Sequence, residues 1–170
     1  MPASSPRIAT IQIAKEYLKF SAAHFTVFSA TERERLHGHN FTVSAEITAW
    51  VDDNGMTSNY RHYKEALKRC CQALDEYVLL PGESPYLVID EQDSAYRVCF
   101  HTDTMTFLKT DTIVLPIRNT TVEEFSHYLL HQLLADEQLS QGSQLTELVV
   151  TVASGPGQTG SSHWQKSSVE

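Results

Sequence analysis

The residues with the clearest chemistry are three histidines in the first quarter of the chain. His37 and His39 lie in the segment LHGHNF (residues 36–41), and His24 ends the earlier segment FSAAH (residues 20–24). Residues two apart in a strand project from the same face, and an antiparallel neighbour could bring His24 onto that face. Three neutral imidazoles around one open position are typical of a catalytic zinc site. The sequence therefore predicts that His24, His37 and His39 bind Zn²⁺.

Taken together, these two segments resemble the zinc signature of the 6-pyruvoyl-tetrahydropterin synthase and 6-carboxytetrahydropterin synthase family. Residues 55–60 (GMTSNY) are similar to the start of the family's first helix. Residues 119–123 (NTTVE) are similar to the segment whose threonine and glutamate help to hold the pterin ring. The resemblance implies that Thr121 and Glu123 bind a pterin substrate.

Several positions depart from the family's usual pattern. The cysteine that usually stands four residues before the first histidine of His-Gly-His is Arg33 here. The family's triad histidine is replaced by Glu76, which follows Asp75, and the late pterin-anchoring glutamate aligns with Ser154. Glu34 instead gives the pattern Glu-x-x-His-Gly-His, which resembles the family branch that uses glutamate and releases 6-hydroxymethyl-dihydropterin from dihydroneopterin compounds.

The resemblance implies a zinc-dependent lyase that acts on dihydroneopterin triphosphate or a related dihydropterin. Zinc would coordinate the side-chain hydroxyls of the substrate and make their protons easier to remove. Glu34 would act as the general base, and the retro-aldol cleavage would leave negative charge that the pterin ring delocalises. Asp75 and Glu76 are candidates for relaying protons.

Other interpretations remain open at this stage. The chain could have 6-pyruvoyl or 6-carboxytetrahydropterin synthase activity with altered catalytic residues, or it could be a non-catalytic zinc-binding paralogue that binds another small heterocycle. A zinc ion that only joins subunits would predict a closed fourth position. Glu34 lies in the alternating run ERER (residues 32–35), which is also typical of a solvated loop. Asp75 and Glu76 could simply form a charged helix end, and Glu123 could only cap a helix.

Composition narrows the possible partners and the compartment. The formal net charge of −8 and the lack of a basic run argue against a nucleic-acid partner. No stretch of eighteen apolar residues and no signal-peptide core occur, so we expect no membrane partner and a cytoplasmic location. The three cysteines suggest no disulfide framework and are read as small buried hydrophobic residues.

The elements that must position these residues follow from periodicity. Alternation of apolar and polar residues predicts strands, and three-and-four spacing predicts helices. We expect strands over 8–23, 41–51, 86–89, 96–100, 104–108, 112–115 and 145–153, helices over 60–77 and 121–134, and a loop over 27–35. Thr120 and Glu123 have the spacing of a capping box. Residues 1–6 and about 159–170 are expected to be loose tails of a single domain spanning 1–170.

This order predicts an α+β fold in which two helices cover one face of an antiparallel sheet. The resemblance identifies that layout as the tunnelling fold of the pterin synthases, in which subunit sheets join into a barrel. It further implies a homohexamer, a dimer of trimers, with the site at the subunit interface.

Overall fold

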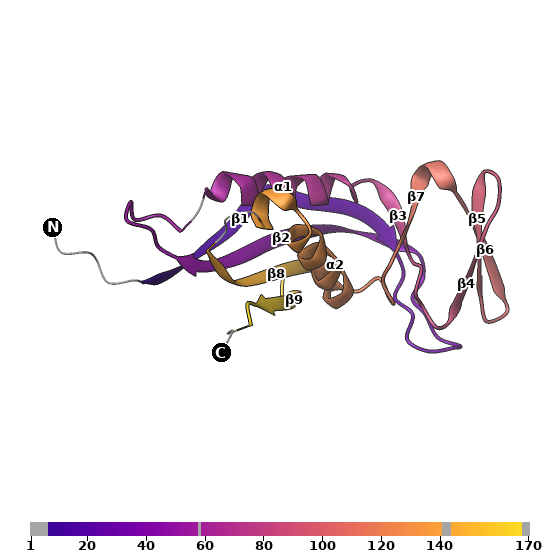
Figure 1. The fold of residues 1–170 in the computed structure, drawn as a ribbon. Coiled ribbons are helices and arrows are strands. Elements are labelled where there is room, and N and C mark those ends of the chain that lie inside the picture. The colour runs from indigo at the N-terminus through magenta and orange to yellow at the C-terminus, as the bar shows by residue number, and fades with distance from the viewer. Residues whose placement is uncertain (1–6, 58, 141–143, 168–170) are drawn as a thin grey trace.

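A long, curved sheet forms the body of the protein (Figure 1). The computed structural model describes residues 7–57, 59–140 and 144–167. The sheet has six strands in the order β7-β3-β1-β2-β8-β9. Their bounds are β1 Ile8–His24, β2 His37–Trp50, β3 Tyr77–Pro81, β7 Thr112–Leu115, β8 Leu145–Gly155 and β9 Gln158–Gln165. The predicted α+β class is confirmed, and antiparallel pairing joins β1, β2, β8 and β9.

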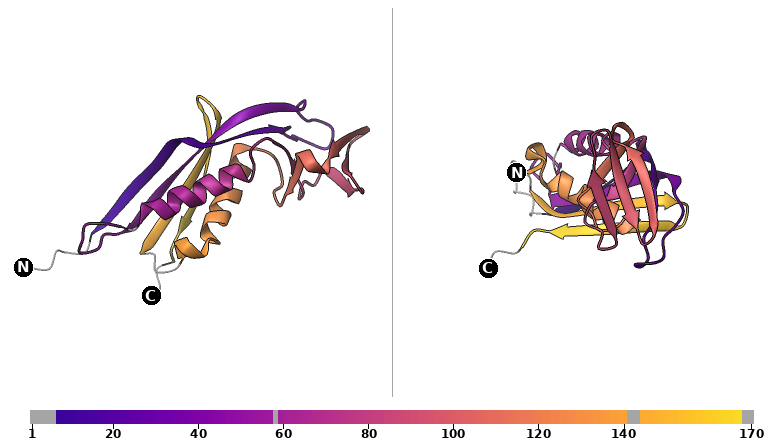
Figure 2. Two further views of the ribbon diagram at one scale, coloured as in Figure 1. Left: turned by 90° about the horizontal axis from the view of Figure 1, so that it is seen from above. Right: turned by 90° about the vertical axis from the view of Figure 1, so that its right-hand side faces the viewer.

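Two helices cover one face of this sheet, as predicted. Helix α1 (Tyr60–Gln72) and helix α2 (Val122–Leu134) lie side by side against it, and a short helix, α3 (Glu137–Ser140), follows α2 (Figure 2). The core between helices and sheet holds stacked and edge-on aromatic rings, with Phe20 and Phe41 from the strands and Phe125 from α2. None of the helices in the described ranges is long and apolar enough to cross a membrane.

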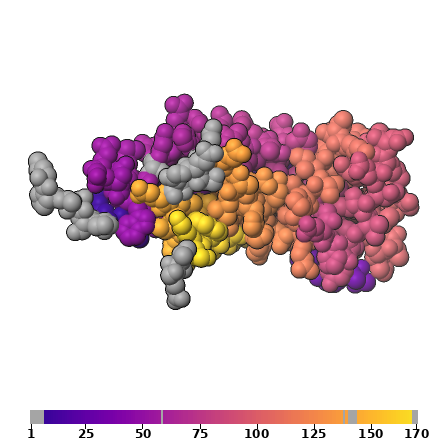
Figure 3. Space-filling model, viewed as in Figure 1, coloured from indigo at the N-terminus to yellow at the C-terminus, as the bar shows by residue number. Residues whose placement is uncertain are grey.

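A second, three-stranded sheet stands at one end of the molecule (Figures 1 and 3). It consists of β4 (Leu87–Glu91), β5 (Ala95–Phe100) and β6 (Asp103–Leu108), and a short 3₁₀ turn, Lys109–Asp111, leads from it to β7. Its own apolar cluster includes Phe25 and Val27 from the segment after β1, together with Phe100 from β5. The small sheet therefore packs directly against the segment that follows His24.

The structure corrects three sequence predictions in the middle of the chain. The first helix ends at Gln72 instead of Tyr77, and the chain then forms β3, which the sequence analysis did not predict. Strands β3 and β7 join the sheet in parallel, so the sheet is mixed. In the second helix the N-cap is Thr121, whose side chain accepts from the Glu124 amide, and the Thr120–Glu123 capping box is wrong.

The C-terminal segment was predicted to be loose from about residue 159, and this is also wrong. Residues 158–165 form β9, which pairs along β8. A Cβ atom added to Gly160 would lie 2.7 Å from the Glu123 amide nitrogen, so glycine allows β9 to contact the start of α2. Residues 1–6 and 168–170 lie outside the described residues. The ordered part of this tail helps to fix the position of Glu123.

Candidate metal centre

The three predicted histidines come together where β1 ends and β2 begins. The register pairs His24 with His37 and Ala22 with His39, which places all three side chains on the same sheet face. Their potential ligand atoms all lie within 4.8 Å of one another. His24 is buried, and His37 and His39 are partly exposed. The group can hold a metal ion on the helix-covered side of the sheet.

Hydrogen bonds turn the ε nitrogens of two histidines toward this shared centre. His24 Nδ1 lies 2.8 Å from the carbonyl oxygen of Thr120, and His37 Nδ1 lies 2.7 Å from that of Arg35. A carbonyl oxygen can only accept, so each Nδ1 carries the proton and each neutral ring keeps a lone pair on Nε2. The Nε2 atoms of His37 and His39 lie 3.1 Å apart.

The donor set fits a metal ion. The Nε2 atom of His24 is buried and has no hydrogen-bond partner among the described residues, an arrangement that normally carries a free-energy cost. Burial lowers the pKa of the His24 imidazole from its usual value to about 4, and the neighbouring His37 and His39 act in the same direction. His24 is therefore neutral near pH 7, which is the form that binds metal.

Glu34 lies beside the three imidazoles. The loop between β1 and β2 folds back through a bridge between Val27 and Arg33, and the Glu34 amide donates to the Thr26 carbonyl at 2.8 Å. In return, the Thr26 amide donates to Glu34 Oε2 at 3.0 Å, and this oxygen lies 3.9 Å from His37 Nε2. Glu34 is thus held at the histidine cluster, close enough to share a small ligand with it.

The charge state of Glu34 follows from its surroundings. Partial burial acts to raise the pKa of its carboxyl group, but hydrogen bonding to the carboxylate by the side chain and by the backbone of Thr26 lowers it, and so do the nearby His37 and His24. The result is a pKa below the ordinary value for glutamate. Glu34 is therefore an ionised carboxylate near pH 7 and can accept a proton.

A cavity of about 260 Å³ opens in front of these groups. Besides the histidines and Glu34, its walls include Thr121 and Glu123 from the start of α2, Ser154 near the end of β8 and Gln158 at the start of β9. The wall also contains Phe28, an aromatic residue that is 58 % exposed and was not among the predicted site residues. A flat ring at the rim could stack against a planar ligand, and its exposure is visible only in the structure.

Asp75 and Glu76 are not part of this cavity within one chain. Asp75 Oδ1 accepts from the Ser21 amide at 2.7 Å, and the Glu76 amide donates to the Ser21 carbonyl at 2.7 Å. Glu76, at φ 67°, lines a separate and more open cavity of about 490 Å³. By strand alternation Ser21 belongs to the sheet face opposite His24. Only His39 lines both cavities.

A second histidine pair lies elsewhere on the molecule. His127 and His131 are four residues apart on α2, and their ring centroids are 4.4 Å apart. The described residues supply no third ligand for this pair, because their one group of three or more possible ligands is the cluster at the end of β1. These two exposed histidines provide a useful control for metal-binding experiments.

The lowered pKa of His24 predicts how stability depends on pH. A proton binds more tightly to His24 in the unfolded chain than in the folded one, so the stability from the neutral ring is complete above about pH 6.5 and is lost toward about pH 4. We expect this group to reduce the unfolding free energy of the metal-free protein by about 3 kcal/mol over that range. Urea unfolding at several pH values should show that the unfolding free energy decreases less in His24→Asn than in the unaltered protein as the pH is lowered. Equal decreases would contradict the prediction.

The fold and the site define an α+β protein with an open three-histidine centre and an adjacent carboxylate. The family model described as 6-pyruvoyl tetrahydropterin synthase matches residues 12–159. The chain therefore belongs to this family, and its arrangement of strands and helices is the tunnelling fold.

The relatives found by comparison agree with that assignment. A solved 6-pyruvoyl tetrahydropterin synthase from Plasmodium vivax is 28 % identical with a TM-score of 0.88, and 94 % of this chain and 99 % of that chain are covered. The Plasmodium falciparum synthase is also 28 % identical, with the same coverage and a TM-score of 0.87. Two further Plasmodium vivax structures replace a glutamate described as a catalytic residue, by alanine and by cysteine. A putative 6-carboxy-5,6,7,8-tetrahydropterin synthase from Methanocaldococcus jannaschii is 26 % identical over 83 % of this chain and 86 % of its own.

Proposed function

We propose that this protein is a zinc-dependent lyase that acts on dihydroneopterin triphosphate or a related dihydropterin and cleaves its side chain to give 6-hydroxymethyl-dihydropterin. The observation that carries the proposal is the Glu34 carboxylate, which faces the same cavity as the three imidazoles. A metal-binding group and a base on one side of a small cavity are suited to removing a proton from a bound hydroxyl.

Zinc is the metal that best suits the proposed site. Three neutral imidazole nitrogens with an open position are typical of catalytic zinc. When bound there, zinc would lower the pKa of the hydroxyl groups on the substrate side chain. The Thr120 and Arg35 carbonyls would keep His24 and His37 oriented, because each accepts from the ring nitrogen that faces away from the centre.

Glu34 performs the proton transfer in this proposal. Its carboxylate removes the proton from the side-chain hydroxyl on the second carbon from the ring. The bond between the first and second side-chain carbons then breaks. The second carbon and its oxygen leave as an aldehyde, and the electron pair of the broken bond passes into the pterin ring. Protonation of the first carbon gives the hydroxymethyl product. The Plasmodium vivax relative, in which a glutamate is described as catalytic, supports this role for Glu34.

Thr121 and Glu123 bind the pterin ring in the same proposal. Both line the cavity at the start of α2. The Glu123 carboxylate would accept hydrogen bonds from the ring amino group and an adjacent ring N–H. Ser154, which also lines the cavity, supplies a hydroxyl where the family usually has a carboxylate.

Replacing Glu123 tests this binding role. Because hydrogen bonds to a charged acceptor contribute about 1.5–3 kcal/mol, we expect Glu123→Gln to raise KM about tenfold or more while kcat changes little. Steady-state kinetics provide the measurement. Glu124→Gln is the matched control, since Glu124 Oε2 accepts from the Arg118 amide and the residue does not line the cavity. A KM that rises equally in both variants would contradict pterin binding by Glu123.

We further propose a homohexamer, a dimer of trimers, of single-domain subunits in the cytoplasm, with the site at a subunit interface. Within one chain, β7 and β9 are the outer strands of the long sheet and can pair with strands of other subunits. In this assembly Asp75 and Glu76 relay protons to the cavity of a neighbouring subunit. Sedimentation analysis tests the subunit number. The described cysteines are free thiols, which suits a reducing compartment.

The second candidate is a 6-carboxytetrahydropterin synthase, which the Methanocaldococcus jannaschii relative of that description favours. Incubating the purified, zinc-loaded protein with dihydroneopterin triphosphate and identifying the products by mass spectrometry separates the possibilities. We expect 6-hydroxymethyl-dihydropterin. A 6-carboxy product would support the second candidate, and a 6-pyruvoyl product would support 6-pyruvoyl-tetrahydropterin synthase activity. No turnover by a protein that binds zinc would favour a non-catalytic paralogue that binds another heterocycle.

A further inference from the structure

Arg33, the residue immediately before Glu34, does not face the metal centre. Its guanidinium lies 5.3 Å from the centre of the Phe25 ring and 5.6 Å from that of Phe100. Its Nη2 atom lies 3.4 Å from Asp103 Oδ2, and its side chain is only 19 % exposed. These contacts connect the loop between β1 and β2 to the small sheet.

The same guanidinium also holds the backbone that carries Glu34. Arg33 Nη1 donates a hydrogen bond of 2.9 Å to the carbonyl oxygen of Glu34. On the other side, the Glu34 amide and carboxylate are held by Thr26. Glu34 is therefore held from both sides, by Thr26 within the loop and by the guanidinium of Arg33, which packs on Phe25 and on Phe100 of the small sheet.

We propose that Arg33 is a positioning residue that holds the Glu34 carboxylate at its place beside the three histidines. This inference rests on the proposed function of Glu34 as the base. Arg33 suits the task because a planar guanidinium can stack on aromatic rings and donate several hydrogen bonds at once. A lysine side chain can make only some of these contacts, and an uncharged aliphatic side chain can make none of them.

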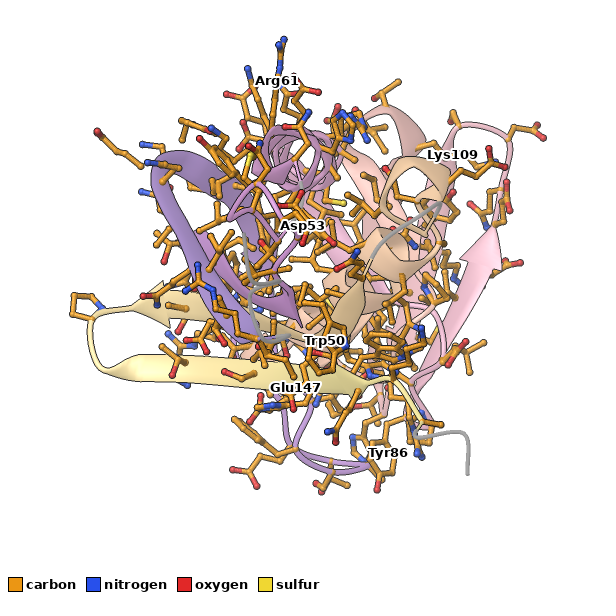
Figure 4. The ribbon with its side chains drawn as sticks, turned by 60° about the vertical axis from the view of Figure 1, so that its left-hand side comes forward. Trp50, Asp53, Arg61, Tyr86, Lys109 and Glu147 are labelled. Atoms are coloured by element: carbon orange, nitrogen blue, oxygen red, sulfur yellow. The ribbon has the colours of Figure 1, made fainter. Side chains whose placement is uncertain are left out.

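Lys109, in the 3₁₀ turn that follows the small sheet, offers a matched control, and Figure 4 labels it. Its Nζ atom lies 5.6 Å from the centre of the Tyr96 ring and 2.7 Å from Glu91 Oε1. It thus combines a cation–π contact with an ion pair, as Arg33 does, but it has no described hydrogen bond to the Glu34 loop. Replacing Lys109 therefore measures the effect on the protein of removing a cation that contacts the small sheet but not the Glu34 loop.

The test compares Arg33→Met, Arg33→Lys and Lys109→Met with the unaltered protein. Because misplacement of a catalytic group by about 1 Å can cost 100-fold, we expect Arg33→Met to lower kcat about 10- to 100-fold. KM should change less than about threefold, since Arg33 does not line the cavity. We expect Arg33→Lys to recover part of the lost kcat and Lys109→Met to retain the original value.

Hydrogen exchange provides a readout that does not depend on turnover. The Thr26 amide donates to the Glu34 carboxylate, and the Glu34 amide donates to the Thr26 carbonyl, so both amides report on how Glu34 is held. We expect them to exchange about tenfold faster in Arg33→Met, less so in Arg33→Lys, and unchanged in Lys109→Met. Faster exchange in a protein that has no lyase activity would support the positioning role and contradict the proposed function. Unchanged exchange and kcat in both Arg33 variants would overturn the inference.

Discussion

Glu34→Gln is expected to remove nearly all lyase activity and to leave the protein folded with its metal bound. General-base catalysis contributes about 100- to 10,000-fold, so kcat should fall by that amount. Glutamine has nearly the same shape, and its amide oxygen can still accept the hydrogen bond that the Thr26 amide now donates to Glu34. The variant therefore removes the proton acceptor and preserves the loop.

Glu32→Gln is the matched control for this variant. Glu32 lies in the same loop, but its side chain is exposed and does not line the cavity. Product formation from dihydroneopterin triphosphate and zinc content should be measured on both proteins. Full activity in Glu34→Gln would show that another group removes the proton, and equal losses in both variants would indicate a general effect on the loop.

His37→Ala should have the second large effect, the loss of metal. Removing even a hydrogen-bond partner of a ligand costs about 10- to 100-fold in metal affinity, so removing a ligand itself should weaken binding by at least about 100-fold. His37 is the best choice among the three because its side chain is 36 % exposed, whereas His24 is buried. The variant should therefore fold and yet bind zinc poorly.

Metal content after dialysis and competition with a chromogenic chelator provide the measurement. We expect about one zinc ion per chain in the unaltered protein and much less than one in His37→Ala. His127→Ala is the control, since this exposed histidine belongs to the pair on α2. The three-histidine centre would be contradicted if His37→Ala retained zinc with unchanged affinity, or if His127→Ala lost it.

Residue spacing predicted the secondary structure correctly where local periodicity determines it. Alternating apolar residues predicted β2, and its inward residues, such as Phe41 and Val43, are buried against the helices. The three-and-four spacing predicted α2, which begins one residue after the expected position. Spacing also predicted that His37 and His39 share a face, because a strand has a fixed two-residue repeat.

Other features depended on contacts between distant segments. β3 has only five residues, and it becomes a strand by pairing with β1 and β7. β9 is rich in polar and small residues, and pairing with β8 orders it. A short or polar segment carries little periodic signal, so partners that are remote in sequence decide its structure.

The sequence by itself determined which three histidines are the candidate metal ligands, the family and the position of Glu34 in the chain. These follow from residue types at fixed spacings, which the local geometry of a strand converts directly into a shared face. Only the tertiary structure decided that Glu76 lines a different cavity from Glu34 within one chain, that Asp75 binds the Ser21 amide, and that Arg33 connects the Glu34 loop to the small sheet. Both outcomes depend on how separate elements pack, and packing is set by long-range contacts that no local spacing encodes.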